Sequence, residues 1–152
     1  MKRALLRLGL LAVFLIAAQP VPASNPTITG EISGVEICVQ SLCDAAVFTG
    51  TCECRVDNRT TPGFFWVSVQ HDPLNTSQPS AIFDGKWTLT TLRGSFSGTV
   101  IEGSIVNTRK NIFRVTARLR LNKGGAGDFF VVGDLDHNDL PPTFEGDLVQ
   151  QP

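Results

Sequence analysis

Apolar and polar residues alternate along the centre of this chain, between residues 112 and 122. From Phe113 onward every second residue is apolar, and Arg114, Arg118 and Arg120 lie between them. Successive side chains of a β-strand point to opposite faces of its sheet, so a period of two predicts a strand. We therefore expect one long antiparallel strand here, with a buried apolar face and a solvated face that carries the three arginines.

A shorter pattern surrounds this stretch, in which a glycine stands two residues from an apolar residue on either side. In a strand these three residues share one face, and the centre of that face lacks a side chain. Glycine weakens a strand and is usually found there at a bend, at a bulge or where another group approaches the backbone. The recurrence predicts a sheet that curls towards closure, although such motifs also arise by chance in glycine-rich β proteins. The six copies are 28–32, 48–52 (which ends in cysteine), 96–100, 101–105, 131–135 and 144–148.

Further short segments of strand-like sequence fill the rest of the chain. Consecutive strands joined by short glycine-rich turns are typical of an up-and-down antiparallel meander. We therefore predict an all-β fold: a single curled antiparallel β-barrel or sandwich of about eight to ten strands, rich in meander connections, after an N-terminal signal peptide. The expected strands are 27–32, 35–39, the segment around residues 52–54, 64–70, 81–83, 86–92, 95–101, 103–108, 112–122, 128–135 and 143–149.

Turns should separate these segments, as judged from Asp, Asn, Gly and Pro. We expect turns at 57–63, 84–85, 107–111 and 122–127, and a tight turn or a bulge at 102–103. In the segment 35–39, the residues Val35, Ile37 and Val39 should share one apolar face, with Cys38 on the other.

The first 23 residues predict a secretory signal peptide. A basic start is followed by an apolar run from Leu8 to Ala18, and Val21-Pro22-Ala23 suits the small-residue cleavage rule. The apolar run is shorter than the ~20 residues that a membrane-spanning helix needs, which disfavours the alternative of an uncleaved anchor. We expect cleavage after Ala23 and a single secreted β domain over 24–152, in a secreted or periplasmic location.

Charge argues against nucleic acid as a partner. Removal of the signal peptide takes away three of the 13 basic residues and no acid, which leaves 10 basic and 14 acidic residues and a net charge of −4. A nucleic-acid partner would require a basic patch. We also expect no stable membrane span after cleavage: an outer-membrane barrel needs strands of ~9–11 residues with aromatic girdles, and only 112–122 is clearly that long.

Cys38, Cys43, Cys52 and Cys54 are all the cysteines of the chain. An even number in an exported protein predicts two disulfides. A bridge between Cys52 and Cys54 should strain the backbone, so a hairpin would nest the pairs as Cys38–Cys54 and Cys43–Cys52. The crossed pairing, Cys38–Cys52 with Cys43–Cys54, is the next alternative. A four-cysteine zinc site is the functional alternative, but the sequence lacks the two C-x-x-C motifs that are typical of such sites.

Two loops are the candidate binding regions. Residues 71–80 are rich in Pro, Asn and Ser, and long loops on rigid β scaffolds often carry binding sites. His71, Asp72 and Asn75 lie in this loop, and His137 lies in the second loop, 134–142. N-glycosylation acceptor sequences begin at Asn58 and at Asn75.

The second loop also suggests a weak calcium site. With Asp134 as position 1, Asp136 takes position 3, Asn138 position 5 and Glu145 position 12 of an EF-hand loop. Position 6, however, is Asp139 where glycine is needed, two prolines follow, and the flanks resemble strands. The sequence therefore excludes an EF-hand. A looser Ca²⁺-binding β-loop is the remaining hypothesis, and the alternative is that these residues only form a turn between two strands.

Catalysis has little support in this sequence. The serines are scattered without a G-x-S-x-G turn, and His71 and His137 are the only histidines. We predict a secreted, non-catalytic binding or surface-interaction module for an unidentified small molecule, glycan or protein, with no cofactor besides the possible Ca²⁺. The alternative is a small secreted enzyme, hydrolase-like or of another class, that uses His71 or His137; a concave pocket with an acid and a nucleophile near either histidine would favour it.

Overall fold

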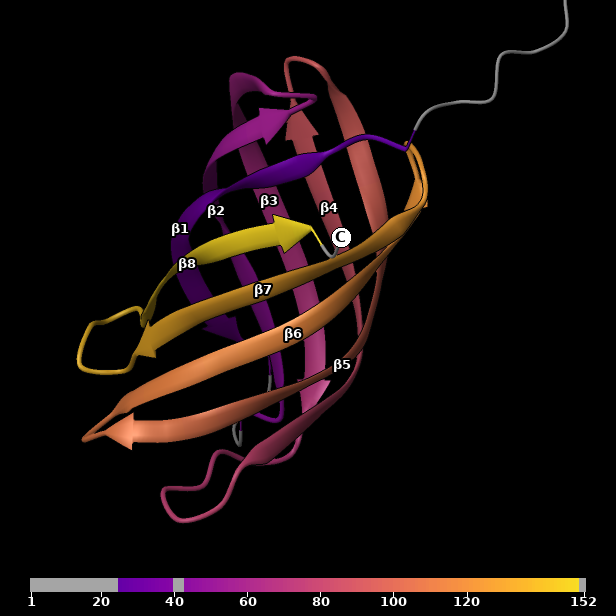
Figure 1. Cartoon of the computed structure of the whole chain (residues 1–152). Helices are drawn as coiled ribbons and strands as arrows, with labels where there is room; N and C mark the ends of the chain where they lie inside the picture. Colours follow the sequence, from indigo (N-terminus) through magenta and orange to yellow (C-terminus); the bar gives the residue numbers. More distant parts are fainter. Residues whose placement is uncertain (1–24, 40–42, 151–152) are drawn as a thin grey trace, which may run out of the picture.

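The computed structural model describes residues 25–39 and 43–150 and contains a closed antiparallel β-barrel (Figure 1). Each of the eight strands pairs with the next along the chain, and β8 pairs with β1 to close the barrel. This confirms the predicted all-β, meander-type fold, whereas the signal peptide predicted for 1–23 lies outside the described residues. The strands are β1 (Ile28–Cys38), β2 (Ala45–Val56), β3 (Arg59–His71), β4 (Ser80–Thr91), β5 (Gly94–Arg109), β6 (Ile112–Lys123), β7 (Gly127–Asp136) and β8 (Thr143–Gln150).

Several expected strands are longer than their local patterns suggested. The segments 27–32 and 35–39 form one strand, β1, and β4 runs through the expected turn at 84–85. β5 continues past Glu102 with a register shift between Val100 and Glu102, so the turn or bulge expected there is a bulge. In β4 two consecutive exposed residues, Phe83 and Asp84, interrupt the alternation of buried and exposed positions just before the buried Gly85, yet the strand continues through them.

The turn expected over 57–63 is also shorter in the structure. Asp57 and Asn58 alone form it, both with positive φ, and pairing of β2 with β3 begins at once with Val56 and Arg59. Asp and Asn tolerate this left-handed conformation better than most residues, which fixes the position of the tight turn. No helix in the described part of the chain is long and apolar enough to cross a membrane.

Side chains fill the interior of the barrel. The apolar positions of β6 all point inwards and are buried, as predicted from the alternation, and its arginines point outwards. The cavity that remains among them measures about 40 Å³ and has an entirely apolar lining. Pockets for small-molecule ligands are usually about 300–1,000 Å³, so the barrel interior is a packed core. Its lining residues are Ile32, Phe48, Phe65, Val67, Val69, Ile82, Val115, Ala117, Leu119, Val131 and Phe144.

The strand glycines allow neighbouring backbones to approach closely. Gly34 lies opposite Gly50 across β1 and β2, and Gly133 lies opposite Gly146 across β7 and β8. A Cβ atom on Gly146 would lie 2.6 Å from the carbonyl oxygen of Val132, well inside van der Waals contact. These positions bear out the expectation that another group approaches the backbone there, and they let the sheet curl sharply enough to close.

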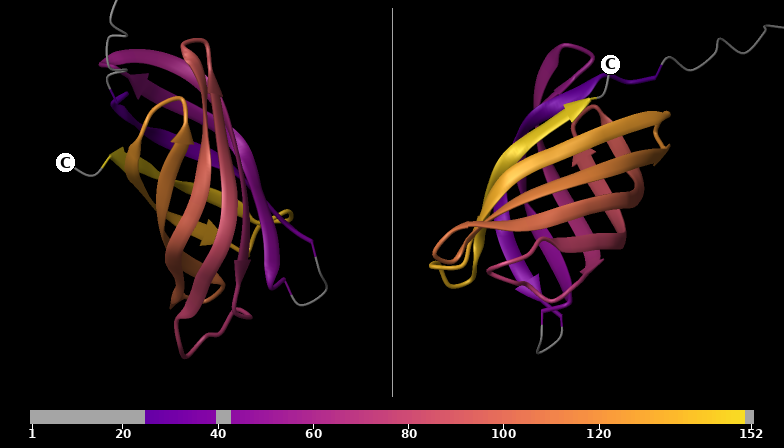
Figure 2. Two further views of the ribbon diagram at one scale, coloured as in Figure 1. Left: turned by 90° about the vertical axis from the view of Figure 1, so that its right-hand side faces the viewer. Right: turned by 60° about the horizontal axis from the view of Figure 1, so that its bottom comes forward.

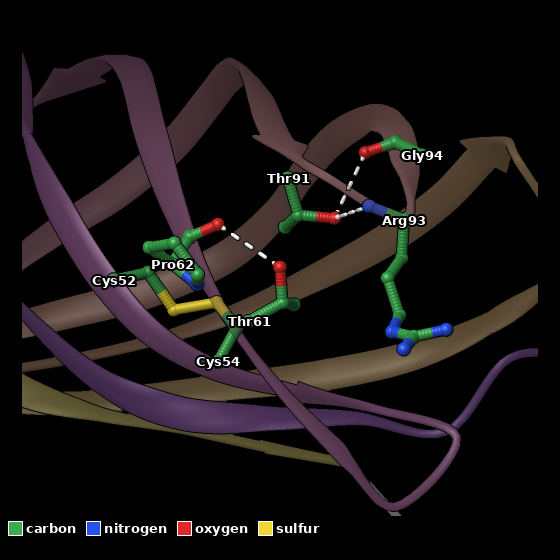
Figure 3. Close-up of a disulfide and its surroundings, with 7 residues drawn as sticks. All are labelled: Cys52, Cys54, Thr61, Pro62, Thr91, Arg93 and Gly94. Atoms are coloured by element: carbon green, nitrogen blue, oxygen red, sulfur yellow. Dashed lines mark hydrogen bonds between the residues drawn. A yellow bond between two sulfur atoms is a disulfide. The ribbon is translucent and has the colours of Figure 1, made fainter.

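Both disulfides join cysteines that are close in sequence, so the nested pairing predicted above is wrong. Cys38 is bonded to Cys43, and Cys52 is bonded to Cys54 (Figure 3). In the β1–β2 register Cys38 lies opposite Ala46 and Cys54 lies opposite Gly30, which separates Cys38 from Cys54 by most of the strand. Two disulfides are typical of proteins from oxidising, extracellular compartments.

Local curling of β2 makes the Cys52–Cys54 bridge possible. Both side chains point into the barrel and are buried, and their Cα atoms lie 5.3 Å apart. Residues two apart in a regular strand are separated by about 6.6 Å, whereas disulfides usually join Cα atoms about 4.4–6.8 Å apart. The Cα separation at Cys52–Cys54 is therefore shorter than in a regular strand and lies within the range that disulfides join.

The disulfide pairing can be tested by cleavage between the two bridges. The unreduced, denatured protein, with free thiols blocked, is cut at Asp44 or after Phe48, both of which lie between Cys43 and Cys52. We expect two separate fragments by mass spectrometry, each two hydrogens lighter than its reduced form. Fragments that remain joined until a reductant is added would show nested or crossed pairing instead.

Because neighbouring backbones approach closely at the interior glycines, even one added methyl group should greatly lower the free energy of unfolding. A Cβ atom on Gly98 would overlap the carbonyl oxygen of Arg120, which also accepts a hydrogen bond from Trp87 Nε1 at 3.1 Å. We expect Gly98→Ala to lower the free energy of unfolding by at least about 2 kcal/mol in urea titrations. Thr99→Ala, on the exposed face of the same strand, should change it by about 0.5 kcal/mol or less. Equal effects would refute the tight contact.

Candidate metal centre

The two ends of the barrel differ in the length of their connections. At one end the strands are joined by short turns at 57–58, 92–93 and 124–126. At the other end, called the long-loop end, they are joined by segments 39–44, 72–79 and 137–142 and by the turn at 110–111. In the right-hand view of Figure 2 the 72–79 segment, the 110–111 turn and the 137–142 segment lie at the lower left of the barrel. The up-and-down topology thus places the two loops predicted from the sequence to bind a partner at the same end of the barrel.

Glu36 is the buried acid of the long-loop end. It occupies the interior face of β1, two positions beyond Gly34, and its side chain is 0% exposed. Its amide donates a hydrogen bond to the carbonyl of Pro142 at 2.9 Å, which ties β1 to the 137–142 segment. Neither carboxylate oxygen has a hydrogen-bond partner among the described residues. An unpaired carboxylate in such a place is costly, because burial removes its hydration.

His71 points into the same end of the barrel from the last position of β3 and is 1% exposed. Its Nδ1 lies 2.7 Å from the carbonyl oxygen of Asp72. A carbonyl only accepts hydrogen bonds, so Nδ1 is the donor of this contact, and in the neutral form of the ring the lone pair lies on Nε2. That Nε2 is buried and has no hydrogen-bond partner within residues 25–39 and 43–150. The ring therefore presents an unused donor atom for a metal ion.

His137 completes the group from the loop that follows β7. Its amide donates to the carbonyl of Asn111 at 2.8 Å, and its ring packs edge-on against Phe113 with centroids 5.2 Å apart. Nε2 lies 2.8 Å from Glu36 Oε2, in a contact that forms an ion pair when the imidazole is protonated but that lacks the alignment of a hydrogen bond. The side chain of His137 is 24% exposed, which makes it the most accessible of the three.

The fourth neighbour of this cluster is Cys43. One oxygen of Glu36, one ring nitrogen of His71 and the sulfur of Cys43 lie within 4.8 Å of one another. In the oxidised protein this sulfur is bonded to Cys38, so it is not a thiolate and does not act as a ligand. The candidate donor set of the oxidised protein is therefore Glu36, His71 and His137.

Two imidazole nitrogens and one carboxylate form a donor set that suits Zn²⁺ and related divalent ions. With bonds of about 2.0–2.1 Å, the ligand atoms around a tetrahedral zinc ion are about 3.3 Å apart. In this structure Glu36 Oε2 lies 2.8 Å from His137 Nε2, and a Glu36 oxygen lies within 4.8 Å of a His71 ring nitrogen, so both histidines are near the carboxylate. A metal-bound histidine usually donates its other N–H to a backbone carbonyl or a carboxylate, as His71 does to Asp72.

Sequence reasoning identified both histidines but missed Glu36. The local pattern of 35–39 suggested that Val35, Ile37 and Val39 faced the core, but Ile37 is 52% and Val39 62% exposed. Counting by twos from Ile28 along the whole of β1 leads instead through Gly30, Ile32 and Gly34 to Glu36. That longer period was the available signal, and it was lost when β1 was divided into two strands.

The residues proposed for a calcium loop lie on the outside of the barrel. Asp134 is paired with Arg114 at 2.7 Å and lies opposite Glu145 across β7 and β8. Asp136 Oδ1 accepts hydrogen bonds from the backbone and the side-chain amide of Asn138, at 2.7 and 2.8 Å. Calcium binding at Asp134, Asp136, Asn138 and Glu145 stays a prediction.

The remaining loop candidates have local structural partners. Asp72 accepts a weak hydrogen bond from the amide of Ala81 at 3.4 Å, in addition to the contact of its carbonyl with His71. Asn75 Oδ1 accepts hydrogen bonds from the amide and the hydroxyl of Ser77, both at 2.8 Å, and its side chain is exposed. These contacts fix the shape of the 72–79 loop beside His71.

The arginine face of β6 forms a separate charged cluster with β7. Asp128 is contacted by Arg120 and Arg118, and Glu102 lies 3.5 Å from Arg118. Hydrogen bonds from Arg120, and then from Arg118, hold the pKa of Asp128 below its usual value, and Asp128 in turn raises the pKa of Arg118. The predicted solvated stripe is therefore an ion-pair network that joins neighbouring strands.

Comparison with known proteins gives no relative for this barrel: the chain matches no protein-family model, no curated protein and no solved structure. Function is therefore inferred from the site itself.

The lowered pKa of Asp128 predicts how this network responds to acid. The pair stabilises the native state above the unfolded-state pKa of about 3.9, and this contribution is lost as the pH falls through the lower native pKa. We expect Asp128→Asn to lower the melting temperature slightly at pH 7, with the difference from wild type shrinking below about pH 4. Melting curves between pH 2 and 7 measure this; a constant difference would contradict it.

Proposed function

We propose that this chain is an exported, non-catalytic metal-binding module that holds a divalent ion, best matched by zinc, at the long-loop end of its barrel. Glu36, His71 and His137 are the ligands. The observation that carries the proposal is that Glu36 and His71 are buried at one place with their donor atoms unpartnered. A bound cation would neutralise the carboxylate and use all three donors, which offsets the cost of burying them.

The donor types favour zinc over calcium or magnesium. Ca²⁺ and Mg²⁺ prefer oxygen ligands, and Ca²⁺ takes six to eight of them, whereas zinc is commonly bound by imidazole and carboxylate together. Copper and nickel also bind imidazole, so the choice of zinc among these ions is part of the proposal and is tested with it. The predicted signal peptide and the two disulfides support export to an oxidising compartment.

The arrangement favours a binding role over catalysis. Three protein ligands would leave one position of a tetrahedral zinc ion open, as in catalytic zinc sites, but Glu36 and His71 are almost completely enclosed, which leaves little access for a substrate. Neither histidine ring is hydrogen-bonded to a hydroxyl or thiol in the described part of the chain, so no nucleophile is positioned for activation. No specific observation favours the alternative of an enzyme that uses His71 or His137.

A metal ion at this point would also order the surface that meets a partner. The ligands come from β1, from the end of β3 beside the 72–79 loop, and from the 137–142 segment. An ion that joins them fixes both loops to the barrel wall. Leu140, in the middle of the second loop, is 98% exposed and offers an apolar contact on that surface. Metal binding and the predicted surface-interaction role are therefore compatible.

The test is a thermal melt of tag-free protein in EDTA, in Zn²⁺ and in Ca²⁺. A ligand specific for the folded state stabilises it, by about 2.7 kcal/mol at a free concentration of 100 times Kd. We expect zinc to raise the melting temperature of the wild type by several degrees and of Glu36→Gln or His137→Ala by little or nothing. The double variant Asp134→Ala/Asp136→Ala is the matched control and should keep the zinc response.

Glu36→Gln gives a second, independent readout. Because it keeps the shape of the side chain and replaces one carboxylate oxygen by an amide nitrogen, the variant should remain folded in EDTA and lose the response to zinc. An undiminished zinc response in this variant would overturn the proposal. A response to Ca²⁺ that is lost only in Asp134→Ala/Asp136→Ala would instead place the ion site on the outer loop.

A further inference from the structure

The Cys38–Cys43 disulfide lies against the proposed metal site. The Cys43 sulfur is within 4.8 Å of a Glu36 oxygen and a His71 ring nitrogen, and Cys43 packs against the core. Cys38 is exposed at the end of β1. This bridge therefore joins a partly buried cysteine beside the buried donor atoms to an exposed cysteine at the end of β1.

Building on the proposed function, we propose that reduction of this disulfide converts the three-ligand site into a four-ligand zinc site in which Cys43 is the additional ligand. Glu36, Cys43, His71 and His137 would then surround the ion. Thiolate, imidazole and carboxylate all bind zinc, and structural zinc sites have four protein ligands. The disulfide thus sets whether the fourth ligand is present.

The chemistry balances with a dithiol reductant. A thiolate of the reductant attacks the Cys38–Cys43 bond, and the mixed disulfide is resolved by the second thiol of the reductant. The S–S bond of the protein is broken, two electrons are transferred to it, and Cys38 and Cys43 leave as thiols while the reductant becomes a disulfide. When Cys43 binds zinc, its sulfur–hydrogen bond breaks and the proton passes to solvent.

The two disulfides differ in their access to a reductant. Cys52 and Cys54 are 2% and 0% exposed inside the barrel, whereas Cys38 can be reached from solvent. Thiol–disulfide exchange requires direct attack on a sulfur atom, so the Cys38–Cys43 bond should be reduced first. This bond closes a short loop, and the entropic contribution of a disulfide to stability is smaller for a shorter loop. The barrel should therefore remain folded after its reduction.

The experiment compares two single-cysteine variants that both lack this bridge. Cys38→Ser leaves the thiol of Cys43 at the cluster, and Cys43→Ser leaves that of Cys38 at the exposed position. Zinc affinity is measured by competition with a chromophoric chelator, and Co²⁺ is used as a spectroscopic probe of thiolate ligation. Melting curves in EDTA establish that both variants are folded, and wild type with and without a phosphine reductant gives the same comparison without substitution.

We expect Cys38→Ser to bind zinc roughly tenfold or more tightly than both Cys43→Ser and oxidised wild type, because a tenfold gain in affinity is what one modest additional interaction provides. It should also show sulfur-to-cobalt charge-transfer absorption, which Cys43→Ser should lack. Reduced wild type should resemble Cys38→Ser.

The outcomes separate this inference from the proposed function. If oxidised wild type binds zinc and the two variants bind it equally without a thiolate band, the inference about Cys43 is overturned and the three-ligand site stands. If only Cys38→Ser and reduced wild type bind zinc, Cys43 is supported as a ligand and the claim that three ligands suffice is overturned. Absence of zinc binding in every form would overturn both.

Discussion

Closure of the sheet through the β1–β8 pairing is the constraint on which the other features depend. A closed barrel satisfies the backbone hydrogen bonds that edge strands would leave unpaired, but its strands must curl tightly enough to meet. The facing glycines Gly34 and Gly50, and Gly133 and Gly146, provide the room for that curl. Closure also fixes the inward face of every strand, and so determines which polar side chains are buried.

The sequence predicted the fold because its signal is local and repeated. The alternation in 112–122 and the glycine motif each act over a few residues, and both survived in the structure. The inward position of Glu36 could not be read from its immediate neighbours in the same way. A strand's face is inverted by a shift of one residue, and the apolar side chains of Val35 and Ile37 favoured the wrong face. The pairing of β1 with its neighbours along its whole length determines that Glu36 faces inwards.

The disulfides and the grouping of Glu36 with the two histidines depend on three-dimensional information that no short pattern carries. The Cys52–Cys54 bridge requires the curl of β2, which follows from closure and not from the spacing of the cysteines. His71 and His137 are 66 residues apart in sequence, and only the alternation of strand directions brings β3 and β7 to an end at the same side of the barrel. Sequence reasoning could name these residues as candidates and could not place them together.

A filled interior restricts where such a barrel can carry function. With a cavity of about 40 Å³, the core has no room for an ordinary ligand, and the outer face of β6 is engaged in ion pairs with β7. At the long-loop end, by contrast, the barrel departs from its apolar interior by burying a carboxylate and an imidazole. Because burial of an unpaired charge opposes folding, such a departure is expected where a site needs those groups. Two of the donors are fixed on strands of a rigid wall, which holds them close to a binding geometry before any ion arrives.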